Sequence, residues 1–118
     1  IFRELKQVFW TRIENRHGGG IPDLYGVYSG FCFWLECKTI IKQNRINISP
    51  LQISWNYKNF QENPNNFYIV QAPRQKVIKL YDGDKGRELL ENGFEYPCSL
   101  EFEPSQYNLL LEFLTVKK

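Results

Sequence analysis

The segment that most constrains the fold is residues 31–38, FCFWLECK, in which five apolar residues lead into a charged end. Ser29 and Gly30 before it form a two-residue turn signal, and residues 23–28, DLYGVY, have a strand pattern on the other side of that turn. The two segments are therefore predicted to pair as a β-hairpin. Because residues 31–35 are apolar on both faces, we expect the second strand to be central and covered on both sides.

The hairpin is expected to bring three charged side chains together at one end. Side chains alternate across a strand, so Glu36 and Lys38 face the same way. Asp23 opens the first strand, and the turn places it at the same end as Glu36, within reach across the ladder. Two carboxylates side by side are costly unless partnered, and a hard cation such as Mg²⁺ relieves that cost. Such a site suits phosphodiester hydrolysis, with Lys38 able to orient water or neutralise developing charge.

The remaining segments mix helical and strand patterns along one chain, which indicates an α/β or α+β fold. Ser49, Pro50 and Gln52 form a helix-start signal, because Ser can cap a helix, Pro suits its first position and Gln closes a capping box. The expected elements are a helix over 1–10, a short strand over 11–14, the helix over 49–61, strands over 67–72 and 77–81, a short helix over 87–92, and a helix from about 104 with an apolar stripe of Tyr107, Leu110, Leu111 and Leu114.

Composition argues against a membrane protein and against a disulfide scaffold. No apolar run approaches the roughly 20 residues of a membrane span, and no signal peptide is visible. The three cysteines, Cys32, Cys37 and Cys98, form no CxxC pair and are odd in number, which fits a reducing compartment. We therefore expect a cytoplasmic protein without a membrane partner. Cys32 and Cys37 lie in the apolar strand and are expected to be small core residues.

Positive charge is concentrated in the first half of the chain. Residues 1–58 hold eight Lys or Arg against four Asp or Glu, whereas residues 59–118 hold seven against nine. Asp23, Glu36 and Lys38 are called the charged cluster below. Basic residues near it in the sequence are candidates for phosphate contacts, and the alternative for each is a solvated surface charge. These candidates are Arg12, Arg16, His17, Lys42 and Arg45. The tryptophans fit core positions better than base-stacking surfaces, and this holds for Trp10, Trp34 and Trp55.

The two halves of the charged cluster together form a known signature. Ile21-Pro22-Asp23 followed by Glu36-Cys37-Lys38 resembles the PD-(D/E)XK nuclease superfamily, most closely the virus-type replication-repair nuclease (VRR-NUC) domains and the archaeal-type Holliday junction resolvases. The further matching segments are GGGIPDL before the hairpin, LECK at the end of its second strand, SPLQ at the start of the next helix, and Arg3-Glu4-Leu5.

The resemblance implies a restriction-endonuclease-like α/β fold, in which a central mixed β-sheet is flanked by helices in the order αβββαβ. It covers a core of about residues 1–82. The chain of 118 residues has room for one domain, so we expect a single nuclease domain over 1–118 with a helical C-terminal extension over about 83–118.

The resemblance also implies roles for the residues of the motif. Asp23 and Glu36 would bind a metal ion together with the backbone carbonyl of Cys37, and Lys38 would be the catalytic lysine. Cys37 replaces the aliphatic residue common at this position, which matters little if only its carbonyl binds metal.

Two further residues carry roles with explicit alternatives. Glu4 would be another metal-binding carboxylate, but it also fits a surface carboxylate, and Glu14 competes for the same role. Gln52 would act in the catalytic site, although the capping box alone also explains a Gln there.

The expected function is that of a Mg²⁺- or Mn²⁺-dependent endodeoxyribonuclease that hydrolyses phosphodiester bonds. The resemblance implies branched or flapped recombination or repair intermediates as substrates, such as Holliday junctions, a homodimeric enzyme, and a virus or phage as one source. Three alternatives stay open: a sequence-specific endonuclease of restriction or homing type, a catalytically silent nucleic-acid-binding domain of the same fold, and a structural domain in which Asp23 and Glu36 do not meet.

Overall fold

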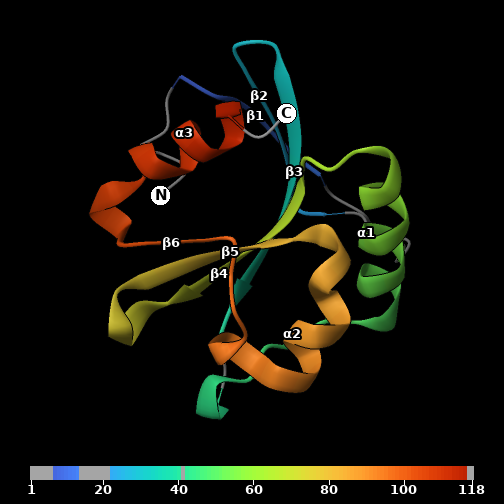
Figure 1. Ribbon diagram of the computed structural model, residues 1–118, viewed down its shortest axis with the longest axis vertical. Coiled ribbons are helices and arrows are strands. Elements are labelled where there is room, and N and C mark those ends of the chain that lie inside the picture. Colours follow the sequence, from blue (N-terminus) through green and yellow to red (C-terminus); the bar gives the residue numbers. More distant parts are fainter. Residues whose placement is uncertain (1–6, 14–21, 41, 117–118) are drawn as a thin grey trace.

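A computed structural model describes residues 7–13, 22–40 and 42–116 of the chain. Its centre is a six-stranded sheet whose strands follow one another in chain order (Figure 1). Neighbouring strands are antiparallel except β3 and β4, which are parallel, so the sheet is mixed as predicted. The strands are β1 (Phe9–Arg12), β2 (Leu24–Tyr28), β3 (Phe31–Thr39), β4 (Asn66–Ala72), β5 (Val77–Asp82) and β6 (Leu100–Phe102).

Helices cover both faces of this sheet, which confirms the predicted α/β class. Helix α1 (Pro50–Glu62) connects the two parallel strands and lies on one face with α2 (Gly86–Asn92), while α3 (Asn108–Val116) lies on the other (Figure 1). Strand β4 is buried on both sides, because its alternate residues enter two separate apolar clusters. The cluster that contains Phe67 and Ile69 of β4 lies between the sheet and α3, and it includes Leu110, Leu111 and Leu114 of the predicted apolar stripe.

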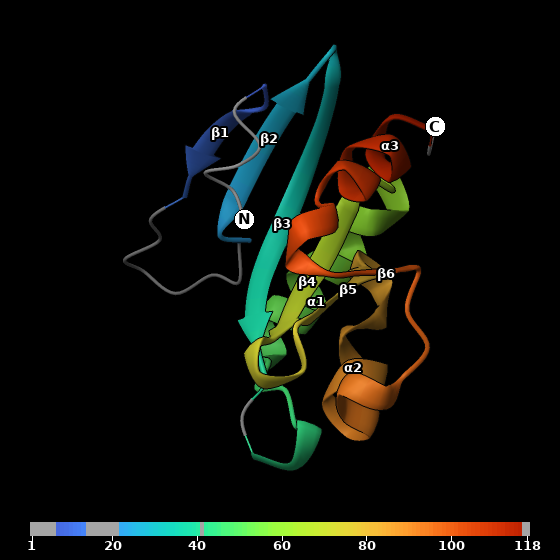
Figure 2. The same cartoon turned by 90° about the vertical axis from the view of Figure 1, so that its left-hand side faces the viewer.

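The predicted hairpin of β2 and β3 is confirmed and sets the register of the sheet. Ser29 and Gly30 both have positive φ angles, 51° and 86°, as a two-residue turn between right-twisted strands requires. Leu24 then pairs with Leu35, and Tyr25 pairs with Trp34. Figure 2 shows β1, β2 and β3 as neighbouring strands.

Helix α1 begins where the sequence predicts. The Ser49 hydroxyl accepts a hydrogen bond from the Gln52 N–H at 3.2 Å, and the Gln52 side chain accepts one from the Ser49 N–H at 3.2 Å. This reciprocal pair is the capping box, and Pro50 occupies the first turn, where it costs no hydrogen bond.

Two expectations for the N-terminal half are wrong. The helix expected over 1–10 is contradicted where the structure describes it, since Phe9 starts β1; residues 1–6 lie outside the described part. Aromatic and β-branched residues in this segment pair with β2, and that pairing outweighs a short helical periodicity. Cys32 is exposed rather than part of the core, because only the carboxyl-terminal half of β3 is covered on the α1 face.

The C-terminal region is not purely helical as expected. Residues 100–102 form β6, which pairs with β5 and extends the sheet on its far edge before α3 begins. Among the described residues, none of the helices is long and apolar enough to cross a lipid bilayer.

Candidate active site

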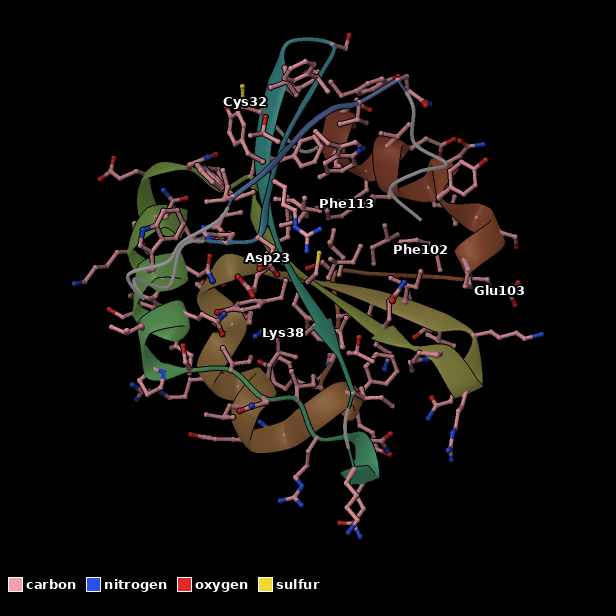
Figure 3. All side chains as sticks on the ribbon, turned by 180° about the vertical axis from the view of Figure 1, so that it is seen from behind. Asp23, Cys32, Lys38, Phe102, Glu103 and Phe113 are labelled. Atoms are coloured by element: carbon pink, nitrogen blue, oxygen red, sulfur yellow. The ribbon has the colours of Figure 1, made fainter. Side chains whose placement is uncertain are left out.

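The register of the hairpin brings Asp23 and Glu36 together. Asp23 lies one residue before the Leu24–Leu35 pair and Glu36 lies one residue after it, so the two carboxylates occupy adjacent strands on one face. The Asp23 carbonyl accepts the Ile13 N–H at 2.8 Å, and its Oδ2 accepts the Cys37 N–H at 3.0 Å. These two contacts position Asp23, which is exposed, next to the buried Glu36; Figure 3 labels Asp23 near the middle of the molecule.

Glu36 is a buried carboxyl with an incomplete set of partners. The residue is 1% exposed. Its Oε2 accepts a hydrogen bond from Gln52 Nε2 at 3.0 Å, whereas its Oε1 accepts none from the described residues. Burial, and after it the nearby Asp23 carboxyl, raise the pKa of Glu36 from 4.5 to about 7, although Lys38 opposes the shift. The site therefore destabilises the ionised carboxylate unless a positive charge is added.

Lys38 follows Glu36 on the same face of β3. Its Nζ donates a hydrogen bond to Gln52 Oε1 at 2.9 Å and lies 3.5 Å from Glu36 Oε2. The side chain is 17% exposed, so the amine is held against the protein but remains open to a ligand. Figure 3 shows Asp23 and Lys38 at the middle of the molecule, beside the buried half of β3.

Gln52 links the helix start to both charged groups. Its Oε1 accepts hydrogen bonds from the Ser49 N–H and from Lys38 Nζ, and this leaves Nε2 to face Glu36. The Tyr68 hydroxyl donates to the Gln52 carbonyl at 3.4 Å and supports the same turn. The cap and the contact with the charged cluster are thus made by one amide, and they do not exclude each other.

Replacing Gln52 with alanine should separate these two contributions. Ser49→Ala removes the cap alone and is expected to lower the free energy of unfolding by about 1 kcal/mol with cleavage retained. Gln52→Ala also removes the partner of Glu36 and Lys38, so we expect cleavage to fall by roughly 10- to 100-fold. Urea denaturation and a cleavage assay on both variants measure this; an equal loss of activity in both would contradict a positioning role.

The donor set fits a divalent cation. Glu36 Oε1 is a buried oxygen that accepts no hydrogen bond from the part of the chain that the structure describes, and the two neighbouring carboxylates repel each other when both are ionised. Within the described ranges, three or more His, Cys, Asp or Glu side chains do not converge on one point, so a cation here would depend on Asp23, Glu36 and backbone or water oxygens. Burial raises the pKa of the Cys37 thiol to about 12, which leaves its carbonyl as the suitable donor.

The other candidates differ in what the structure says of them. Glu4, Arg16 and His17 lie outside the described residues. Arg12 pairs with Leu24 and so lies on the opposite face of the sheet from Glu36, where its charge is close enough to lower the pKa of Cys37.

Lys42 and Arg45 lie beyond the carboxyl end of β3 and are not gathered with the charged cluster. Lys42 and Arg74 both line a surface hollow whose lining also includes Thr39, the residue after Lys38 in the chain. Sequence reasoning missed Arg74, because the parallel pairing of β3 and β4 brings its turn next to Lys42. The basic turn of residues 73–76 was the available signal.

Comparison with known proteins leaves the family open. The sequence matches no protein-family profile and no curated protein. Among solved structures, the bacterial homing endonuclease I-Ssp6803I is similar, with a TM-score of 0.46 and 10% sequence identity over 98% of this chain and 86% of that one. The resemblance to PD-(D/E)XK nucleases therefore stays a prediction, and function is argued below from the site itself.

Proposed function

We propose that the chain is a Mg²⁺- or Mn²⁺-dependent endonuclease that hydrolyses phosphodiester bonds in DNA. The observation that carries the proposal is the convergence of Asp23 and Glu36 from adjacent strands, with the Lys38 amine 3.5 Å from Glu36 and a shared partner in Gln52. Acidic groups with a neighbouring amine, open to solvent at Asp23, suit a phosphate ester and a water nucleophile.

Asp23, Glu36 and the Cys37 carbonyl would hold the cation. When bound, the cation supplies Lewis-acid polarisation of a phosphoryl oxygen and lowers the pKa of a coordinated water. Glu4 remains a candidate for a further carboxylate of this set.

The protein's own groups would orient the substrate and stabilise charge. Gln52 holds the partly exposed Lys38 amine 3.5 Å from Glu36 Oε2, where it can donate a hydrogen bond to a phosphate oxygen as negative charge develops. Burial of Glu36 keeps water away from one side of the site, so this interaction is stronger than it would be in bulk solvent.

The substrate is expected to be DNA with branches or flaps, and the enzyme a homodimer, since paired cuts at a junction suit a two-fold assembly. Labelled linear, flapped and four-way DNA incubated with Mg²⁺, with EDTA as the control, test the activity and the preference together. Failure to cut any of these, by protein shown to be folded, would refute the nuclease proposal. Equal cutting of all three would refute only the branch preference, and sedimentation measures the dimer.

Lys42 and Arg74 are expected to contact DNA phosphates beside the site. Lys42→Ala and Arg74→Ala should each reduce the slope of log affinity against log salt by about one, because fewer counterions are released on binding. Lys58 on α1 lines a different groove, so Lys58→Ala is the matched control and should leave the slope unchanged. Unchanged slopes in the first two variants would identify both as solvated surface charges.

A further inference from the structure

Three partly exposed aromatic rings form a row on the α1 side of the hairpin. The row consists of Tyr25 on β2, Trp34 on β3 and Trp55 on α1. The centroids of Tyr25 and Trp34 are 4.7 Å apart, and those of Trp34 and Trp55 are 5.5 Å apart. All three side chains are half-buried, so Trp34 and Trp55 do not occupy the core positions that the sequence predicted. The row borders solvent and differs from core rings such as Phe33 and Phe67, which are 1% and 0% exposed.

This aromatic row continues directly from the two carboxylates. Tyr25 follows Asp23 by two residues and Trp34 precedes Glu36 by two, so each ring shares a sheet face with its carboxylate. Two residues along a strand span about 7 Å. Successive phosphates of one stacked strand are about 3.4 Å apart along the helix axis, so the row lies about two nucleotides from the site.

Beyond the row, the described elements leave the sheet face uncovered. Cys32 is exposed and points to the α1 side of the hairpin in Figure 3. Phe9 pairs with Val27, on the same face as Tyr25, and is 72% exposed. Figure 1 shows the turn of β2 and β3 extending past the end of α1, and none of the described helices covers it on that side.

Exposed aromatic rings on a sheet face, next to a site that is proposed to bind a phosphate, are suited to stacking with unpaired bases. The faces of bases inside an uninterrupted duplex are already stacked, whereas single-stranded or splayed bases expose theirs and stack on aromatic side chains. The short distance from the row to Glu36 lets one strand place a phosphate at the site and a base on a ring. The absence of acidic residues between Cys37 and Gln61 also favours an approaching polyanion over a basic partner.

We propose that the aromatic row of Tyr25, Trp34 and Trp55 stacks unpaired bases next to the scissile phosphate, so that the site takes single-stranded or flapped DNA in preference to duplex. This inference rests on the proposed function, because it assumes that a DNA strand occupies the site.

Binding measured in EDTA tests the row without requiring cleavage. Tyr25→Leu and Trp34→Leu are each expected to weaken binding of single-stranded and flapped DNA by about ten-fold and to leave duplex binding unchanged. Tyr57→Leu is the control, since Tyr57 is 54% exposed on α1 and lines the groove toward α2 instead. Circular dichroism of each variant verifies the fold, and Tyr25→Leu carries the test if Trp34→Leu unfolds.

Two results would overturn the inference: equal losses for duplex and single strands, or dissociation of a dimer with DNA affinity unchanged, which would make the row a contact between copies. Quenching of tryptophan fluorescence by single-stranded DNA is the expected direct signature. Because cleavage plays no part in this assay, base stacking by a protein that never cuts DNA would refute the nuclease proposal while leaving the binding preference intact.

Discussion

Replacing Lys38 with alanine is expected to reduce DNA cleavage by at least about 100-fold while the fold is retained. The amine is the cation held nearest to Glu36 among the described residues, at 3.5 Å, and its removal takes away the donor expected to stabilise charge on the phosphate. The side chain contributes little to the core, because its partners are Gln52 and Glu36 and it borders solvent. Single-turnover cleavage with Mg²⁺ measures the effect.

Lys58→Ala is the matched control for that experiment, since Lys58 is exposed on α1 and lines a groove away from the charged cluster. Asp23→Asn complements Lys38→Ala: the amide can still accept the Cys37 N–H, so the backbone contact survives while the charge is removed. We expect the same reduction in cleavage from Asp23→Asn. Wild-type rates in Lys38→Ala or Asp23→Asn would mean that the cluster is not the catalytic centre.

Glu36→Gln is expected to stabilise the metal-free protein above pH 7 although it abolishes cleavage. Folding raises the pKa of Glu36 from 4.5 to about 7, mainly through burial and then through Asp23, so the folded state binds a proton more tightly than the unfolded state. The free energy of unfolding should therefore fall as pH rises from 4.5 to 7, by about 3 kcal/mol, and then level off. Glutamine cannot ionise, so this part of the pH dependence should disappear.

Urea denaturation in EDTA at both ends of that pH range measures the difference. Glu62→Gln, at an exposed position of α1, is the control and should follow the wild-type curve. Adding Mg²⁺ is expected to restore stability to the wild type at the higher pH and to leave Glu36→Gln unaffected, because a ligand that binds only the folded state stabilises it. A Glu36→Gln curve parallel to the wild type would show that the buried charge carries no penalty.

Local signals with a clear physical cause were predictable from the sequence. The turn at Ser29 and Gly30 requires positive φ angles, and the capping box of Ser49 and Gln52 satisfies backbone donors that are otherwise unpaired, so both elements form where expected. The meeting of Asp23 with Glu36 followed from that turn together with strand alternation.

Features that depend on long-range pairing were not predictable in this way. Phe9 begins a strand because β2 offers a partner, and β6 exists because β5 has a free edge. Both partner strands were predicted, but the pairing with them is not visible in the local pattern of residues 9–12 or 100–102. The position of Arg74 beside Lys42 depends on the parallel pairing of β3 and β4. The contact of Gln52 with Lys38 and Glu36 depends on how α1 packs against the sheet. The hydrophobic pattern of the sequence does not define that packing.

The Gln52 side chain both caps the start of α1 and contacts Lys38 and Glu36. Loss of activity on heating should therefore follow fraying of this helix end. The first turn of a helix opens at a lower free-energy cost than the whole domain. When that turn opens, Lys38 and Glu36 lose their common partner although the sheet stays intact. Heating should therefore stop turnover before the protein melts, and Ser49→Ala, which loosens the same turn, should widen the gap between the two temperatures.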